Sequence, residues 1–248
     1  MSAPAATRLH PALLFAGTEA RRGNDRSECE DQVACAGTRF AVADGASEGG
    51  YSHVWARILV DAFCAAGHHG NQRSRAWLDV ARRGWRRWAD ELSGRELPWF
   101  TRESLRMGAY AAFAGIIVSD RARPTWTAVS CGDSCIFLVR NEKLVCAFPV
   151  SAGHAFTTAP PLVASTSGAG ADGFERRHGI ARAGDRFYLV TDALAQWFLL
   201  THKRGGAPWR HLDAVSSHNQ FERLVAAERA SGALRNDDVA LLTVAISA

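Results

Sequence analysis

The hydrophobic period changes twice along this chain, and this order of changes limits its fold more than any other feature. Short apolar runs near the N-terminus predict strands at residues 12–16, 32–36 and 39–43. Gly37-Thr38, between the second and third runs, is a hairpin signal. Apolar residues then recur every three or four positions, which predicts one helix from Val54 to about Gly67 and another from about Arg73 to Leu92.

The pattern returns to that of strands from Pro124 onward. A meander is predicted at 126–131, 135–140 and 143–148, and its first turn is Gly132-Asp133-Ser134. A further strand at 186–190, helices at 194–201 and 221–230, and a closing strand at 239–246 follow. The segment 151–172, rich in small and polar residues, is interpreted as a mobile loop. Strands joined by hairpin turns and interspersed with paired helices favour an α+β layered sandwich over a doubly wound parallel sheet.

Composition excludes several classes of protein. Of the 248 residues, 47% are hydrophobic and 22% charged, which is typical of a globular chain and not of a disordered or fibrous one. The net charge of +4 is too small to require a nucleic-acid partner. The sequence shows neither a secretory leader nor an apolar run of about 18 residues, so we expect a cytoplasmic protein without a membrane span, with a flexible N-terminus at 1–10.

The sequence contains six cysteines, but disulfide bonds are not expected in a chain of this length that shows no secretory leader. We interpret them as reduced, mostly buried thiols. The sequence contains no C-x-x-C pair, and its histidines do not have zinc-finger spacing, so a structural zinc site is not expected.

Arginine and tryptophan alternate along the second predicted helix. Trp77, Trp85 and Trp88 fall on one stripe, whereas Arg83 and Arg87 fall largely outside it. This pattern is compatible with nucleic-acid or membrane binding. We favour the simpler interpretation of a core-facing stripe with a solvated outer face.

Acidic residues stand at the ends of several predicted strands. Asp44 follows 40–43, Asp192 follows 187–191, Asp237-Asp238 precede 239–244, and Glu30-Asp31 precede the strand paired with the one ending at Asp44. Carboxylates gathered beside an apolar core repel one another, and hard divalent cations that take oxygen ligands relieve the repulsion. Any one of these residues alone is more simply explained as a turn or helix cap, but the ordered set favours a metal site.

These motifs, taken in order, resemble the type 2C (PPM) metal-dependent protein phosphatases. The similarity covers residues 12–246. The motifs that carry it are Arg26 followed by Glu30-Asp31, the apolar strand ending in Asp44-Gly45, Gly132-Asp133-Ser134, Thr191-Asp192-Ala193, and Asp237-Asp238. The resemblance implies a four-layer α-β-β-α sandwich of two antiparallel sheets flanked by helix pairs, in one catalytic domain over 11–248.

The resemblance also implies residue roles. Asp44 would bridge two metal ions, helped by the Gly45 carbonyl, and Asp192 and Asp237 would hold one of the ions. Glu30 and Asp31 would act mainly through metal-bound waters. Two further roles follow: Arg26 would grip the phosphate, and Asp133 would bind a weaker third ion. The implied cofactors are Mn²⁺ or Mg²⁺, and the implied reaction is hydrolysis of phosphoserine or phosphothreonine by a water that two metals activate.

Alternatives stay open for individual residues. Arg26 could be a surface ion-pair residue, Asp133 a plain turn aspartate, and Asp192 the cap of the helix that follows it. Ala193 replaces a family glycine, and Ala46 stands where some members carry a histidine. A pseudophosphatase that binds a signalling partner without turnover is therefore the competing function.

The expected partners follow from the same resemblance. They are a phosphoprotein substrate and an opposing serine/threonine kinase, with neither nucleic acid nor membrane, and the chain is expected to be a monomer.

Overall fold

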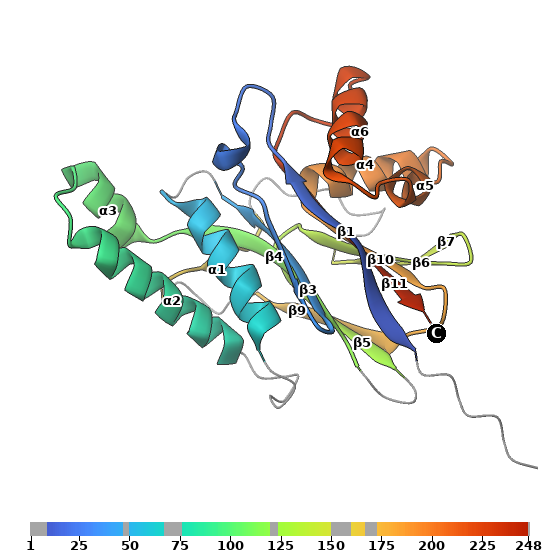
Figure 1. Ribbon diagram of the computed structural model, residues 1–248, viewed down its shortest axis with the longest axis horizontal. Helices are drawn as coiled ribbons and strands as arrows, with labels where there is room; N and C mark the ends of the chain where they lie inside the picture. Colours follow the sequence, from blue (N-terminus) through green and yellow to red (C-terminus); the bar gives the residue numbers. More distant parts are fainter. Residues whose placement is uncertain are drawn as a thin grey trace, which may run out of the picture.

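The computed structural model describes residues 9–46, 50–66, 76–119, 124–149, 160–166 and 173–247. Two β-sheets are stacked at the centre of the molecule, and helices lie on their outer sides (Figure 1). Every strand pairing within these described residues is antiparallel. The layered α+β prediction is therefore confirmed.

Sheet I contains five strands that come from both ends and the middle of the chain. In spatial order they are β1 (His10–Glu19), β11 (Val239–Ser247), β10 (Arg186–Val190), β6 (Cys135–Arg140) and β7 (Lys143–Phe148). The central strands β10 and β11 are buried along almost their whole length, as expected for strands covered on both faces.

Sheet II is built mainly from the first half of the chain. In spatial order its strands are β2 (Gln32–Ala36), β3 (Arg39–Gly45), β4 (Tyr110–Val118), β5 (Thr125–Cys131) and β9 (Glu175–Ile180), with the short β8 (Val163–Ala164) paired to β4.

The helices are divided between the two outer faces (Figure 1). On the side of sheet II lie α1 (Ser52–Ala65), α2 (Ala76–Ser93) and α3 (Trp99–Met107). On the side of sheet I lie α4 (Asp192–Lys203), α5 (Pro208–Asp213) and α6 (His218–Ala230). A 3-10 turn, η1 (Arg26–Glu28), precedes β2.

Three apolar clusters hold these layers together. One lies between the sheets and includes Phe187 and Val42. Another packs α4, α5 and α6 on sheet I, with Phe137 and Phe198 stacked at a centroid distance of 4.0 Å. The third packs α1 and α2 on sheet II. Because each sheet buries both faces, the predicted four-layer α-β-β-α sandwich is confirmed.

The arginine and tryptophan helix is a core helix. Trp77 and Trp85 are buried, and Trp85 meets Trp55 of α1 edge to face at 6.1 Å. Arg83 and Arg87 are exposed on the opposite side. The core-facing interpretation of this stripe is thus confirmed. No helix in the described part of the chain combines the length and apolarity needed to cross a membrane.

One prediction of connectivity is wrong. The predicted meander would pair β5 with β6, but β5 belongs to sheet II and β6 to sheet I. The Gly132-Asp133-Ser134 turn is therefore a crossing between sheets. Both strands are buried on both faces, so neither shows the alternation that would reveal its partner. Gly132 has φ of +96°, and a Cβ there would lie 2.6 Å from the Cβ of Ala112.

Other differences concern elements without a clear periodic signal. β4, α3, β9 and α5 were not predicted, and β8 lies within the segment interpreted as a mobile loop. Residues 151–159 and 167–172 of that loop lie outside the described residues, as do 1–8 of the predicted flexible N-terminus and the predicted helix start near 73. β1 begins at His10, before the predicted strand, and extends to Glu19.

Candidate metal centre

Asp44 is placed by the β2–β3 hairpin. It lies near the end of β3 and is half-buried, with its backbone opposite Ala112 of β4. Gln32 pairs with Ala43 at the open end of the hairpin, so Asp31, one residue before β2, lies beside Asp44. Hairpin register thus gathers two acids that are thirteen positions apart in the sequence.

Asp192 and Asp237 are placed by sheet I. Antiparallel pairing of β10 with β11 brings the end of β10 next to the start of β11, and the Thr191 amide donates to the Ala240 carbonyl at 3.4 Å. Asp192 begins α4 directly after β10. Thr191 occupies the N-cap position of α4 without a side-chain cap hydrogen bond, and Asp192 is the acidic residue of the first turn, so the capping alternative for Asp192 stays open.

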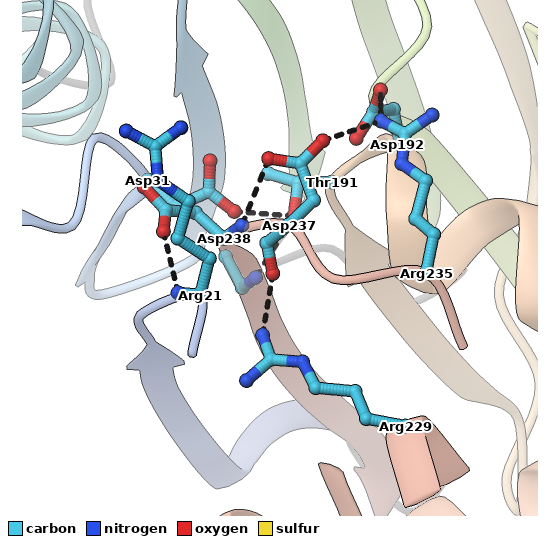
Figure 2. Close-up of polar contacts among 9 residues, drawn as sticks. Arg21, Asp31, Thr191, Asp192, Arg229, Arg235, Asp237 and Asp238 are labelled. Carbon is cyan, nitrogen blue, oxygen red and sulfur yellow. Dashed lines mark hydrogen bonds and ion pairs between the residues drawn. The ribbon is translucent and has the colours of Figure 1, made fainter. Parts of the chain in front are cut away.

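Thr191 also connects the two sheets. Its hydroxyl donates to Oδ2 of Asp31 at 2.6 Å (Figure 2). The same hydroxyl accepts from the Ala240 amide at 2.8 Å. Asp31 is only 1% exposed. The buried carboxylate before β2 is therefore fixed by a hydroxyl at the end of β10.

The crossing between the sheets delivers a third carboxylate. Asp44, Asp133 and Asp192 each offer one carboxylate oxygen, and these three atoms lie within 4.8 Å of one another. They come from sheet II, the crossing and the start of α4, respectively. The sequence placed Asp133 in a hairpin, and its proximity to Asp44 and Asp192 follows from the crossing.

Burial and mutual repulsion raise the pKa values of several of these carboxyl groups. Burial, followed by the charges of Asp31 and Asp192, raises the pKa of Asp44 well above its ordinary value. Burial also raises the pKa of Asp133 to about 6, with a contribution from Asp192. Burial raises the pKa of Asp31, and the hydrogen bond from Thr191 opposes the rise. A cluster that disfavours its own ionisation is suited to an added cation.

The donor set fits a hard divalent cation. Oδ2 of Asp31 accepts from Thr191, but its buried Oδ1 has no hydrogen-bond partner among the described residues. Buried carboxylate oxygens are normally satisfied, so this atom calls for a donor or a cation. The clustered oxygens of Asp44, Asp133 and Asp192 supply the all-oxygen environment that Mg²⁺ and Mn²⁺ prefer.

Glu30 and Asp238 brace the site. The Asp238 carboxylate accepts from the backbone amides of Arg21 and Glu30, both at 2.8 Å. The Glu30 carboxylate accepts from the hydroxyl of Ser52, at the start of α1. Asp238 therefore holds the segment before β2, while the Glu30 side chain joins that segment to α1. The water-mediated metal role predicted for Glu30 stays a prediction.

Arg235, which contacts the predicted ligand Asp237, is a part of the site that the sequence did not reveal. The Arg235 guanidinium donates to Oδ2 of Asp192 and lies 2.9 Å from Oδ2 of Asp237 (Figure 2). Asp237 is thus joined to the three-acid cluster through an arginine. The only sequence signal was the position of Arg235, two residues before Asp237.

Arg26 and Gly45 differ in solvent exposure. Arg26 begins η1 and is exposed. Gly45 ends β3 and is buried, and a Cβ there would lie 2.8 Å from the backbone carbon of Ser52. The phosphate role of Arg26 and the metal role of the Gly45 carbonyl stay predictions.

Comparison with solved structures identifies the architecture. The Mycobacterium tuberculosis serine/threonine phosphatase PstP/Ppp superposes with a TM-score of 0.64 at 19% identity, over 96% of this chain and all of that one. Stp1 of Staphylococcus aureus, also a serine/threonine phosphatase, gives 0.64 at 14% identity, over 98% of both chains. The chain has the type 2C phosphatase fold.

A solved structure with this fold contains metal ions. The PstP catalytic domain in complex with two manganese ions matches with a TM-score of 0.62 at 19% identity, over 97% of this chain and all of that one. Neither a protein-family model nor a curated protein matches the sequence. The type 2C assignment therefore concerns the fold, and the function is argued from the site.

Proposed function

We propose that this chain is a metal-dependent serine/threonine protein phosphatase whose single catalytic domain covers residues 11–248. The observation that carries the proposal is the convergence of Asp44, Asp133 and Asp192 within 4.8 Å on a type 2C fold. Fold alone does not define an activity, but an oxygen-rich site on that fold favours one.

The cofactors proposed are two Mn²⁺ or Mg²⁺ ions, with a third, weaker site at Asp133. Asp44 and Asp192 would hold the ions, and Asp237, the Gly45 carbonyl, Glu30 and Asp31 would complete the site directly or through water. Such ions, when bound, supply Lewis acidity and lower the pKa of a coordinated water towards about 7. The PstP complex with two manganese ions supports this reading.

The chain's own residues would bind and orient the substrate. Arg26 is exposed, so its side chain is accessible to a phosphate, and its planar fork can bind two phosphate oxygens at once. Asp31, held by Thr191 at 2.6 Å, has one free oxygen with which to position a water. Ala46 offers no side-chain acid, so the leaving group would take its proton from solvent within the site.

The proposed substrate is a phosphoprotein, and the proposed counterpart is a serine/threonine kinase. We propose that the chain acts as a monomer in the cytoplasm, where its cysteines would be reduced. All six cysteines lie in the described part of the chain, none of them forms a disulfide there, and all except Cys35 are buried.

Hydrolysis of a phosphothreonine peptide tests the function. The purified protein should release phosphate with Mn²⁺ or Mg²⁺ and stop when a chelator is added in excess. Asp44→Asn is the matched inactive variant. Full activity in chelator would contradict the metal mechanism, and Mn²⁺ binding without any turnover would favour the pseudophosphatase.

A further inference from the structure

Two arginines contact residues of the loop between α6 and β11, Arg229 from α6 and Arg235 from within the loop, and their partners differ in kind (Figure 2). Arg229 is 9% exposed and donates to two backbone carbonyls, of Ala20 at 2.9 Å and of Asp237. Arg235 instead pairs with the carboxylates of Asp192 and Asp237. Arg229 binds neutral carbonyls and supports the backbone, whereas Arg235 neutralises charged groups that a metal ion would also bind.

The position of Arg235 makes it an internal cation of the acidic site. Its guanidinium contacts Asp192, which belongs to the three-oxygen cluster, and the charge of Asp44 acts on it as well. A single guanidinium nitrogen, Nη2, lies within ion-pair distance of both carboxylates, so one positive charge serves Asp192 and Asp237 together. With Arg235 in place, the negative charge on the Asp192 side is already compensated.

The loop allows this side chain to leave without unfolding. Asn236 accepts from the Arg22 amide at 2.8 Å, and Asp238 accepts from the amides of Arg21 and Glu30. These contacts hold the backbone on the C-terminal side of Arg235. The Arg235 side chain itself is 41% exposed, so it can move into solvent while the loop stays in place.

We propose that Arg235 is a built-in competitor for metal on the Asp192–Asp237 side, which must be displaced before a divalent cation binds there. This inference rests on the proposed function and deepens its metal-binding step. A competing state that holds about nine-tenths of the molecules weakens the apparent metal affinity about tenfold. The arginine would thereby keep the acidic site stable without metal and make occupancy dependent on metal concentration.

Manganese titration by calorimetry tests the competition directly. Arg235→Gln should bind Mn²⁺ about tenfold more tightly than the wild type. Arg235→Lys should fall between the two, because it keeps the positive charge as a compact, strongly hydrated ammonium. Arg210→Gln is the matched control, since Arg210 forms an exposed ion pair with Glu142 at 2.9 Å outside the cluster. Its Mn²⁺ affinity should equal that of the wild type.

A second readout follows the arginine itself. In a Mg²⁺ titration of protein with ¹⁵N-labelled arginine side chains, the Arg235 resonance, identified by its loss in Arg235→Lys, should shift with the binding curve. Methylguanidinium should weaken Mn²⁺ binding to Arg235→Ala and have little effect on the wild type. An Arg235→Gln affinity equal to or weaker than that of the wild type would overturn the proposal.

The same samples separate this inference from the proposed function. A wild type that dephosphorylates the peptide with Mn²⁺, together with equal affinities in the two proteins, leaves the function standing and refutes the competition. Tighter binding by Arg235→Gln in a protein without turnover supports the competition and refutes the phosphatase.

Discussion

Single acidic residues were the most predictable part of this site. Asp44 and Asp192 could be found because each ends an apolar strand, where an unpaired charge is costly. Arg235 could not be found in this way, since an arginine in a polar turn has no distinguishing pattern. Its role depends on Asp192, 43 positions away, and only the folded chain brings the two together.

Asp192→Asn should lower Mn²⁺ affinity at least about tenfold, since it removes a charged oxygen from the cluster. Stability in chelator should change by only about 1 kcal/mol, because the lost pair with the part-exposed Arg235 is weak. Calorimetric titration and chemical denaturation measure the two effects. Ser217→Ala is the control: Ser217 caps α6 by accepting from the Gln220 amide, so its loss should cost about 0.5–2 kcal/mol and spare metal binding. Wild-type affinity in Asp192→Asn would remove it from the ligand set.

Arg26→Ala should reduce kcat/KM for a phosphopeptide about tenfold or more. A hydrogen bond to a charged group contributes about 1.5–3 kcal/mol, and each 1.4 kcal/mol or so corresponds to a factor of ten. The Mn²⁺-induced rise in melting temperature should persist. Arg57→Ala, which removes an equally charged, exposed residue paired with Asp61 on α1, should leave the kinetics unchanged. If the two variants behave alike, Arg26 is a surface residue.

At the scale of elements, hydrophobic periodicity predicted where strands occur better than it predicted which strands pair. Strands β2 and β3 and their hairpin are local, and the sequence located them to within two residues. β5 and β6 were located equally well but assigned to one sheet, because continuous apolar runs do not show which strand lies alongside. The buried Ser130 hydroxyl lies within hydrogen-bond distance of the carbonyls of Phe113, at 3.1 Å, and of Ser134, at 3.2 Å. That contact supports the crossing and is invisible in the sequence.

Gly45→Ala tests how tightly β3 and α1 are apposed at the metal centre. The added methyl would lie 2.8 Å from the backbone carbon of Ser52, so the strand end and the helix start must separate. We expect a loss of about 1–3 kcal/mol from overpacking and weaker Mn²⁺ binding, although the Gly45 carbonyl is retained. Gly94→Ala is the control, because its nearest neighbour would lie at 3.6 Å, and it should change stability by less than about 0.5 kcal/mol. Equal stability in the two variants would show that the contact yields easily.

At the scale of the whole molecule, the acidic centre lies where the two sheets meet. Sheet II contributes Asp44, α4 contributes Asp192 next to sheet I, and the β5–β6 crossing contributes Asp133. Without metal, repulsion among these carboxylates opposes the packing of the two sheets, and the raised pKa of Asp44 reflects this repulsion together with burial. Cations bound among these carboxylates would join the two sheets. Metal should therefore act on global stability as well as on activity.

Asp44 is the residue on which that coupling depends. A ligand present at about 100 times its Kd stabilises a folded protein by about 2.7 kcal/mol, which for a chain of this size raises the melting temperature by about 5–10 °C. We expect Mn²⁺ to produce such a rise in the wild type, chelator to reverse it, and Asp44→Asn to lose most of it. In chelator, Asp44→Asn should be at least as stable as the wild type, because the substitution removes a charge that its neighbours and its burial disfavour.

Asp61→Asn removes the same charge from the exposed face of α1, where Asp61 pairs with Arg57, and should keep the full metal response. Scanning calorimetry of the three proteins, with and without Mn²⁺, gives both quantities. A metal response of wild-type size in Asp44→Asn would mean that the cation binds elsewhere and that the two sheets are joined by packing alone.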